Sequence, residues 1–76
     1  MPKNSQIQAQ LKAFGANVRR ERTAKGVTQE RLAELVDLNI RTVQKIEAGD
    51  INVLVTTALR IQRVLGFPWG RLMPMC

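Results

Sequence analysis

The chain contains no histidine, no tyrosine and a single cysteine, and each shortage excludes a kind of site. Because Cys76 is the single cysteine, no disulfide can form within the chain, and this cysteine usage is typical of a cytoplasmic protein. Without histidine or a second cysteine, the chain lacks a metal-ligand cluster and the common nucleophile–base pairs. A glycine-rich phosphate loop is also absent. We therefore expect no enzyme activity, no metal and no cofactor.

Long apolar runs are missing too. No run approaches the roughly 18 residues that a membrane span needs, and residues 1–10 lack the apolar region of a signal peptide. Seventy-six residues suffice for one small core. We expect a single domain over residues 6–73, between a flexible segment over residues 1–5 and a tail over residues 74–76. No small-molecule ligand is expected, because such a site would normally need a second domain.

Acidic residues are few compared with basic ones. Twelve lysines and arginines against six aspartates and glutamates give a formal net charge of +6. This balance favours a polyanionic partner, since lysine and arginine neutralise phosphates when a protein binds nucleic acid. A basic surface is also common in proteins that bind no nucleic acid. The placement of the basic residues along the chain therefore has to decide whether the partner is a nucleic acid.

Residues 28–49 are predicted to hold two short amphipathic helices joined by a tight turn. In the first helix Leu32, Ala33 and Val36 recur on one face, and Thr28 is a natural N-cap. The second helix is expected over residues 40–48. It begins after Asn39, which is another natural N-cap, and only Val43 and Ile46 point inward.

The second of these helices carries a polar outer face. On an arc of roughly 140°, away from the apolar side, the helical wheel gathers Ile40, Arg41, Gln44, Lys45 and Ala48. Such a face, in a basic chain, is typical of a helix that binds DNA. The opposite interpretation is that Arg41 and Lys45 are only a solvated surface.

Flanking helices are predicted from apolar residues at positions i, i+4, i+7 and i+11. The first stripe, on a helix expected to run to Ala24, consists of Ile7, Leu11, Phe14 and Val18. The other consists of Leu54, Ala58, Ile61 and Leu65. Gly66 and Pro68 end that helix, and Pro68 is placed to open a short last turn. Residues 51–55, INVLV, are expected to form a loop.

The order and spacing of these segments resemble the Cro/C1-type helix-turn-helix family, the family of the phage lambda repressor. The resemblance extends from about Phe14 to Leu72 and is carried by FGANVRRERTAKGVTQERLAELVDLN, RTVQKIEAGDIN, LRIQRVLG and WGRL. It implies an all-α, compact five-helix lambda-repressor-like domain that binds specific double-stranded DNA and regulates transcription. The apolar loop INVLV is similar to that of restriction-modification controller proteins. A departure is Asp37, where the family often has glycine.

The resemblance also implies roles for individual residues. Gln29 would lie against a DNA phosphate, the helix over residues 40–48 would enter the major groove, and Glu47 would pair with Arg22 in a structural ion pair. The predicted base-contacting residues are Ile40, Arg41, Gln44 and Lys45. For Ile40, packing against the core is an equally good interpretation. The predicted phosphate-contacting residues are Gln29, Asn39, Asn52 and Arg19. Asn52 would alternatively only shape its loop, and Arg19 would only add to the general positive charge.

Members of this family usually bind paired half-sites as twofold dimers. We expect a homodimer whose interface is apolar and consists of Ile51, Val53, Leu54, Trp69 and Leu72. Repression is the expected mode, with activation through contact of Glu30 and Glu34 with RNA polymerase as a further option. The alternative function is an antitoxin-like or adaptor module, in which the same apolar residues bind another protein.

Overall fold

The computed structural model describes residues 2–73, with side chains from residue 6 onward, and contains five helices and no strand over this range. The helices are α1 (Pro2–Ala24), α2 (Gln29–Val36), α3 (Ile40–Ala48), α4 (Val55–Leu65) and α5 (Trp69–Leu72). This architecture confirms the expected all-α, five-helix domain. Residues 51–54 form a loop, whereas Val55, which the predicted loop also included, begins α4. None of the described helices is both long and apolar enough to span a membrane.

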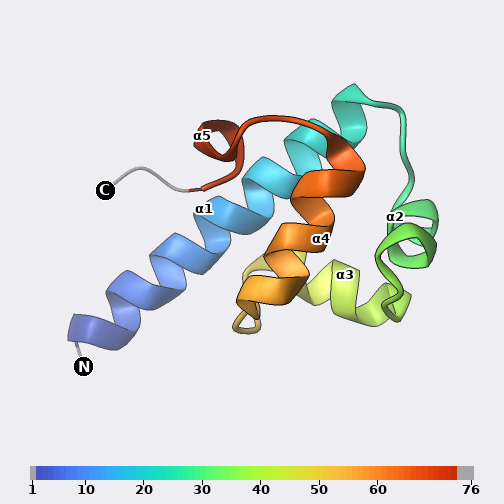
Figure 1. Ribbon diagram of the computed structural model, residues 1–76. Coiled ribbons are helices and arrows are strands. Elements are labelled where there is room, and N and C mark those ends of the chain that lie inside the picture. Colours follow the sequence, from blue (N-terminus) through green and yellow to red (C-terminus); the bar gives the residue numbers. More distant parts are fainter. Residues whose placement is uncertain (1, 74–76) are drawn as a thin grey trace.

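Helix α1 is longer than expected and extends past the other helices at its N-terminal half (Figure 1). It begins at Pro2, so the helix includes residues 2–5, which were expected to precede the domain. Proline suits the first position of a helix, because its fixed φ is helical and its missing N–H would have had no partner there. Phe14 and Val18 of the predicted stripe are buried, whereas Ile7 near the free end is 46% exposed. The predicted tail, residues 74–76, lies outside the described residues.

The bounds of α2 and α3 follow from their caps. The hydroxyl of Thr28 accepts a hydrogen bond from the backbone N–H of Arg31 at 3.0 Å, and the side-chain oxygen of Asn39 accepts one from the N–H of Arg41 at 2.8 Å. Asp37 ends α2 in the left-handed conformation, at φ 59° and ψ 50°. Gly49 ends α3 at φ 76°, where glycine has no steric penalty.

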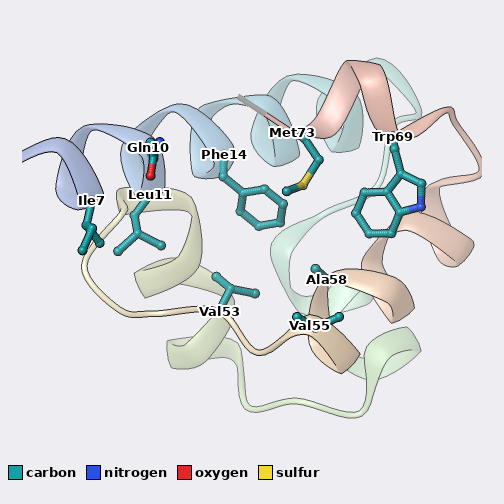
Figure 2. A pocket seen from close by; sticks show the side chains of 9 residues that line it. All are labelled: Ile7, Gln10, Leu11, Phe14, Val53, Val55, Ala58, Trp69 and Met73. Carbon is teal, nitrogen blue, oxygen red and sulfur yellow. The ribbon is translucent and has the colours of Figure 1, made fainter. Parts of the chain in front are cut away.

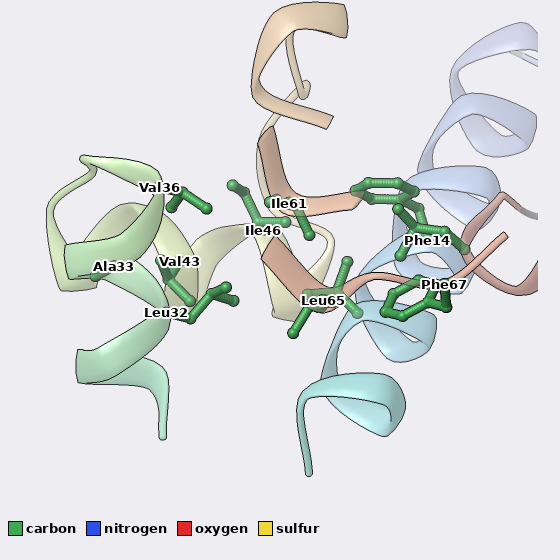
Figure 3. Close-up of a cluster of buried hydrophobic side chains, with 11 residues drawn as sticks. Phe14, Leu32, Ala33, Val36, Val43, Ile46, Ile61, Leu65 and Phe67 are labelled. Carbon is green, nitrogen blue, oxygen red and sulfur yellow. The ribbon is translucent and has the colours of Figure 1, made fainter. Parts of the chain in front are cut away.

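The core lies where α1, α2, α3 and α4 meet, and α5 closes it at one end (Figures 1 and 3). Its buried members are Phe14, Val18, Leu32, Ala33, Val36, Val43, Ile46, Ile61, Leu65, Phe67 and Leu72. The inward residues predicted for α2 and α3 are all among them. Phe67 was not predicted. It stands between Gly66, which ends α4, and Pro68, and its ring packs into the core at 5% exposure.

Helix α5 is held against α1 by hydrogen bonds to its last carbonyl groups. The side-chain nitrogen of Asn17 donates to the carbonyl oxygen of Leu72 at 2.8 Å, and a guanidinium N–H of Arg20 donates to that of Arg71 at 2.7 Å. The same guanidinium binds the carboxylate of Glu21 at 2.9 Å, and Glu21 is only 7% exposed. These contacts fix the C-terminal side of the domain relative to its first helix.

Candidate nucleic-acid interface

One exposed face of α3 presents three hydrogen-bonding side chains, those of Arg41, Gln44 and Lys45. They line a shallow hollow of about 350 Å³ together with Ala48 and Asp50. Among the described residues, neither Arg41 nor Lys45 forms an ion pair. Their donors therefore point to solvent and are available to a ligand.

Ile40 lies at the N-terminal edge of this face and differs from the other predicted base-contacting residues. It is half-buried and packs against the core. The packing interpretation of Ile40 therefore holds. Only the remaining part of its side chain is accessible for an apolar contact.

A buried ion pair fixes α3 relative to α1. Arg22 Nε donates to Glu47 Oε2 at 2.6 Å and Arg22 Nη2 donates to Glu47 Oε1 at 3.1 Å. The structural pair predicted from the family is therefore present. Glu47 lies on the inner side of α3, so this carboxylate positions the helix and takes no part in its exposed face.

The same carboxylate sets the orientation of an amide at the start of α2. Gln29 Nε2 donates to Glu47 Oε1 at 3.0 Å. Because an ionised carboxylate can only accept hydrogen bonds, the NH2 group of the Gln29 amide must face Glu47. The carbonyl oxygen of Gln29 consequently faces the other way, where Gln44 Nε2 lies 3.5 Å from it. This link between Glu47, Gln29 and Gln44 was not predicted, because its members are separated in sequence and belong to two helices.

The predicted phosphate-contacting residues lie at four different places. Gln29 and Asn39 are at the N-termini of α2 and α3, where Asn39 uses its side-chain oxygen for capping. Asn52 is exposed in the loop between α3 and α4, and Arg19 is exposed on α1. Apart from the Gln29 and Asn39 contacts described above, the structure gives these four side chains no other hydrogen bond among the described residues.

An apolar hollow of about 360 Å³ lies on another side, between the first half of α1, the loop before α4 and α5 (Figure 2). It is lined by Ile7, Gln10, Leu11, Phe14, Val53, Val55, Ala58, Trp69 and Met73. At its edge Leu54 and Val55 are 71% and 75% exposed. Ile51, Val53 and Trp69 are half-buried.

Leu72 does not belong to this surface. Its side chain is fully buried, at 0% exposure, because α5 folds back and inserts it into the core. The prediction that Leu72 forms part of an interface was therefore wrong. Ile7 also lines the apolar hollow but was not predicted to do so, because the expected interface was taken from the loop INVLV and the C-terminal end alone.

Comparison with known proteins identifies a family and similar solved structures. A family model described as Helix-turn-helix matches residues 18–72. The crystal structure of the restriction-modification controller protein C.AhdI from Aeromonas hydrophila superimposes with a TM-score of 0.81 and is 37% identical in sequence. That match covers 86% of this chain and 98% of the controller protein. No curated protein matches the chain.

Proposed function

Since the chain belongs to the Cro/C1-type helix-turn-helix family of DNA-binding transcription regulators, we propose that it binds a palindromic operator as a homodimer and represses transcription. In this proposal α3 is the recognition helix and lies in the major groove. The protein acts in the cytoplasm, where the DNA of a bacterial or phage regulator is found.

The exposed face of α3 is the observation that carries the proposal. Arg41 and Lys45 each offer donors that match the O6 and N7 acceptors of guanine, and Gln44 suits the donor and acceptor of adenine. Each good bidentate contact discriminates against a wrong base by about 1–3 kcal/mol. The buried pair of Arg22 and Glu47 supports this role, because it fixes the helix that presents these side chains.

Contacts to the sugar–phosphate backbone would set the position of α3 in the groove. We assign them to Gln29, Asn39, Asn52 and Arg19. Gln29 retains a second Nε2 hydrogen after bonding Glu47, and the N-terminal amide groups of α2 lie beside it. A phosphate at that point would meet both.

A homodimer is proposed because one recognition helix reads too few base pairs to select an operator. Two half-sites about 34 Å apart, centre to centre, would be read by two copies. The apolar hollow supplies a surface for the second copy through Val53, Val55 and Trp69, and Ile51 and Leu54 of the same loop would extend it. Exposed apolar surface of this kind commonly marks a protein interface.

Repression, and not activation, is proposed because of where the bound dimer would lie on the DNA. A dimer seated on an operator that overlaps a promoter excludes RNA polymerase and represses. Glu30 and Glu34 are exposed on α2 and would be the contacts if the protein instead recruited polymerase.

Selection from random duplexes at physiological salt tests the proposal. We expect a palindromic consensus that binds at least about a thousandfold more tightly than scrambled DNA. Arg41→Ala should abolish this preference, whereas Arg63→Ala, on the outer face of α4, should leave it intact. Failure to enrich any sequence, with a correctly folded protein, would contradict the proposal.

A second candidate function is a protein-interaction module of the antitoxin or adaptor type. The exposure of Leu54 and Val55 favours it, since a partner protein would cover them as well as a second copy would. A chain that stays monomeric, selects no DNA and binds another protein through this surface would establish the second function in place of the first.

A further inference from the structure

A second, polar hollow lies between the first half of α1 and the loop that follows the recognition helix. Its volume is about 440 Å³, and its lining consists of Ile7, Gln8, Leu11, Lys12, Gly49, Asp50, Ile51 and Asn52. Ile7 and Leu11 point from α1 toward this loop (Figure 2). The hydrogen-bonding side chains of the hollow are those of Gln8, Lys12, Asp50 and Asn52.

Lys12 is brought to this hollow by a close approach of two backbones. A Cβ atom on Gly49 would lie 2.6 Å from the Cα of Lys12 and 2.6 Å from its Cγ, so the end of α3 is pressed against α1 at this lysine. The lysine side chain is exposed. The Lys12 side chain therefore leaves α1 beside the C-terminal end of the recognition helix.

The polar hollow is continuous with the exposed face of α3. Asp50 lines both this hollow and the one formed by Arg41, Gln44, Lys45 and Ala48. A helix in the major groove is flanked on both sides by sugar–phosphate backbone. A duplex seated on α3 would thus bring one of its strands to the polar hollow.

The loop in this hollow offers hydrogen-bond donors. Within the part of the chain that the structure describes, the backbone N–H groups of Ile51 and Asn52 donate to no protein acceptor. The carboxylate of Asp50 would repel a phosphate that approached these amides. The ammonium of Lys12, on the opposite wall, offsets that charge.

We propose that Lys12 and Gln8, together with the amide groups of Ile51 and Asn52, bind one phosphate of the DNA strand beside the recognition helix. The site rests on the proposed function. It differs from the contacts assigned above because it belongs to the extended first helix, in the part of α1 that precedes the helix-turn-helix match at residue 18. Gln8 adds an amide one helical turn before Lys12.

The salt dependence of operator binding tests the site, with Lys12→Gln and Lys25→Gln as a matched pair. Both lysines are exposed, but Lys25 follows α1 at its opposite end, near Gly66. One phosphate contact contributes about 0.9 to the slope of log affinity against log salt, and a K12Q homodimer would lose two such contacts, so the advantage of wild type over K12Q should shrink about 12-fold between about 50 and 200 mM salt. K25Q should retain the wild-type slope, and Lys12→Arg should retain most of the contact.

A second measurement identifies the phosphate itself. Neutral methylphosphonates placed one at a time along the selected operator should weaken wild-type binding at a position beside the half-site where K12Q shows no further loss. Equal effects of K12Q and K25Q, with no such position, would overturn the site while leaving sequence-specific binding intact. Absence of sequence-specific binding by the wild type would instead overturn the proposed function, and the site with it.

Discussion

The side chains of Arg22 and Glu47 join α1 to α3 through two hydrogen bonds, of 2.6 and 3.1 Å. Their side chains are 12% and 3% exposed, so both charges are largely removed from water. Arg22 also donates to the carbonyl oxygen of Val27 at 2.8 Å, in the loop before α2. One guanidinium therefore holds together α1, the start of the helix-turn-helix and α3.

Replacing Arg22 by methionine should destabilise the protein by about 3–5 kcal/mol, because Glu47 would stay buried without its cation. Replacing Glu47 by leucine in the same chain should recover much of the loss, since a buried ion pair can often be exchanged for apolar side chains at little cost. Urea denaturation of both single variants and of the double variant measures this. A double variant whose loss equals the sum of the single losses would contradict the coupling.

Among the described residues, Asp37 is the one non-glycine residue with a positive φ, a conformation that is unfavourable for a side chain with a Cβ. It is also the C-cap of α2, where its negative charge is repelled by the negative end of the helix dipole. Asp37→Gly should therefore stabilise the fold by roughly 0.5–1 kcal/mol, after the larger entropy of glycine in the unfolded chain is counted. Asp37→Asn keeps the side-chain shape and removes the charge, so it separates the two effects. A loss of stability in both variants, measured by thermal unfolding, would show that Asp37 makes a compensating contact.

The ends of α2 and α3 could be predicted from the sequence because the residues that set them lie at the helix ends themselves. Thr28 and Asn39 cap α2 and α3 with their own side chains, and Gly49 supplies the positive φ that ends α3. Apolar spacing likewise gave the inner faces of both helices. The polar face of α3 follows from the same wheel, so the exposure of Arg41 and Lys45 needed no tertiary information.

The remaining features depend on pairs of residues that the fold alone brings together. Arg71 is an ordinary surface arginine in the sequence, yet it meets Glu21 from 50 positions away. Phe67 has no helical register by which its burial could be seen. Lys12 becomes part of a polar hollow only because the end of α3 is pressed against it.

Gly15 marks the second close contact between α1 and α3. A Cβ atom at this position would collide with the carbonyl oxygen of Ile46 and lie 2.6 Å from that of Glu47. Gly15→Ala should thus cost about 1–3 kcal/mol, although alanine is the better helix former. Gly70→Ala is the matched control, because nothing lies within 4 Å of its added Cβ, and it should leave stability unchanged or raise it. Equal effects in both variants would show that α1 and α3 can separate without cost.

Asp50 places a carboxylate at the junction of the two polar hollows, where DNA is proposed to lie. Asp50→Asn should strengthen binding to operator and scrambled DNA alike, by up to about fivefold for each copy in the proposed dimer, since two unit charges about 4 Å apart in water interact by about 1 kcal/mol. Titration of both duplexes at one salt concentration measures it. A selective loss of operator binding would instead assign Asp50 to a base contact, such as the amino group of cytosine.

A substitution at Leu54 can test the dimer without weakening the fold of the single chain. It is 71% exposed and occupies the N-cap of α4, where it makes no capping hydrogen bond. Leu54→Asp should cap α4, because aspartate is among the best N-cap residues, while placing a charge in the proposed interface. We expect the dimer to dissociate in sedimentation experiments while the helical circular dichroism is retained. Leu35→Asp, on the exposed side of α2, is the control for an apolar-to-acidic change and should leave association unaltered. If L54D remained as dimeric as the wild type, the second copy would have to bind elsewhere, and the apolar hollow would be open to a different protein.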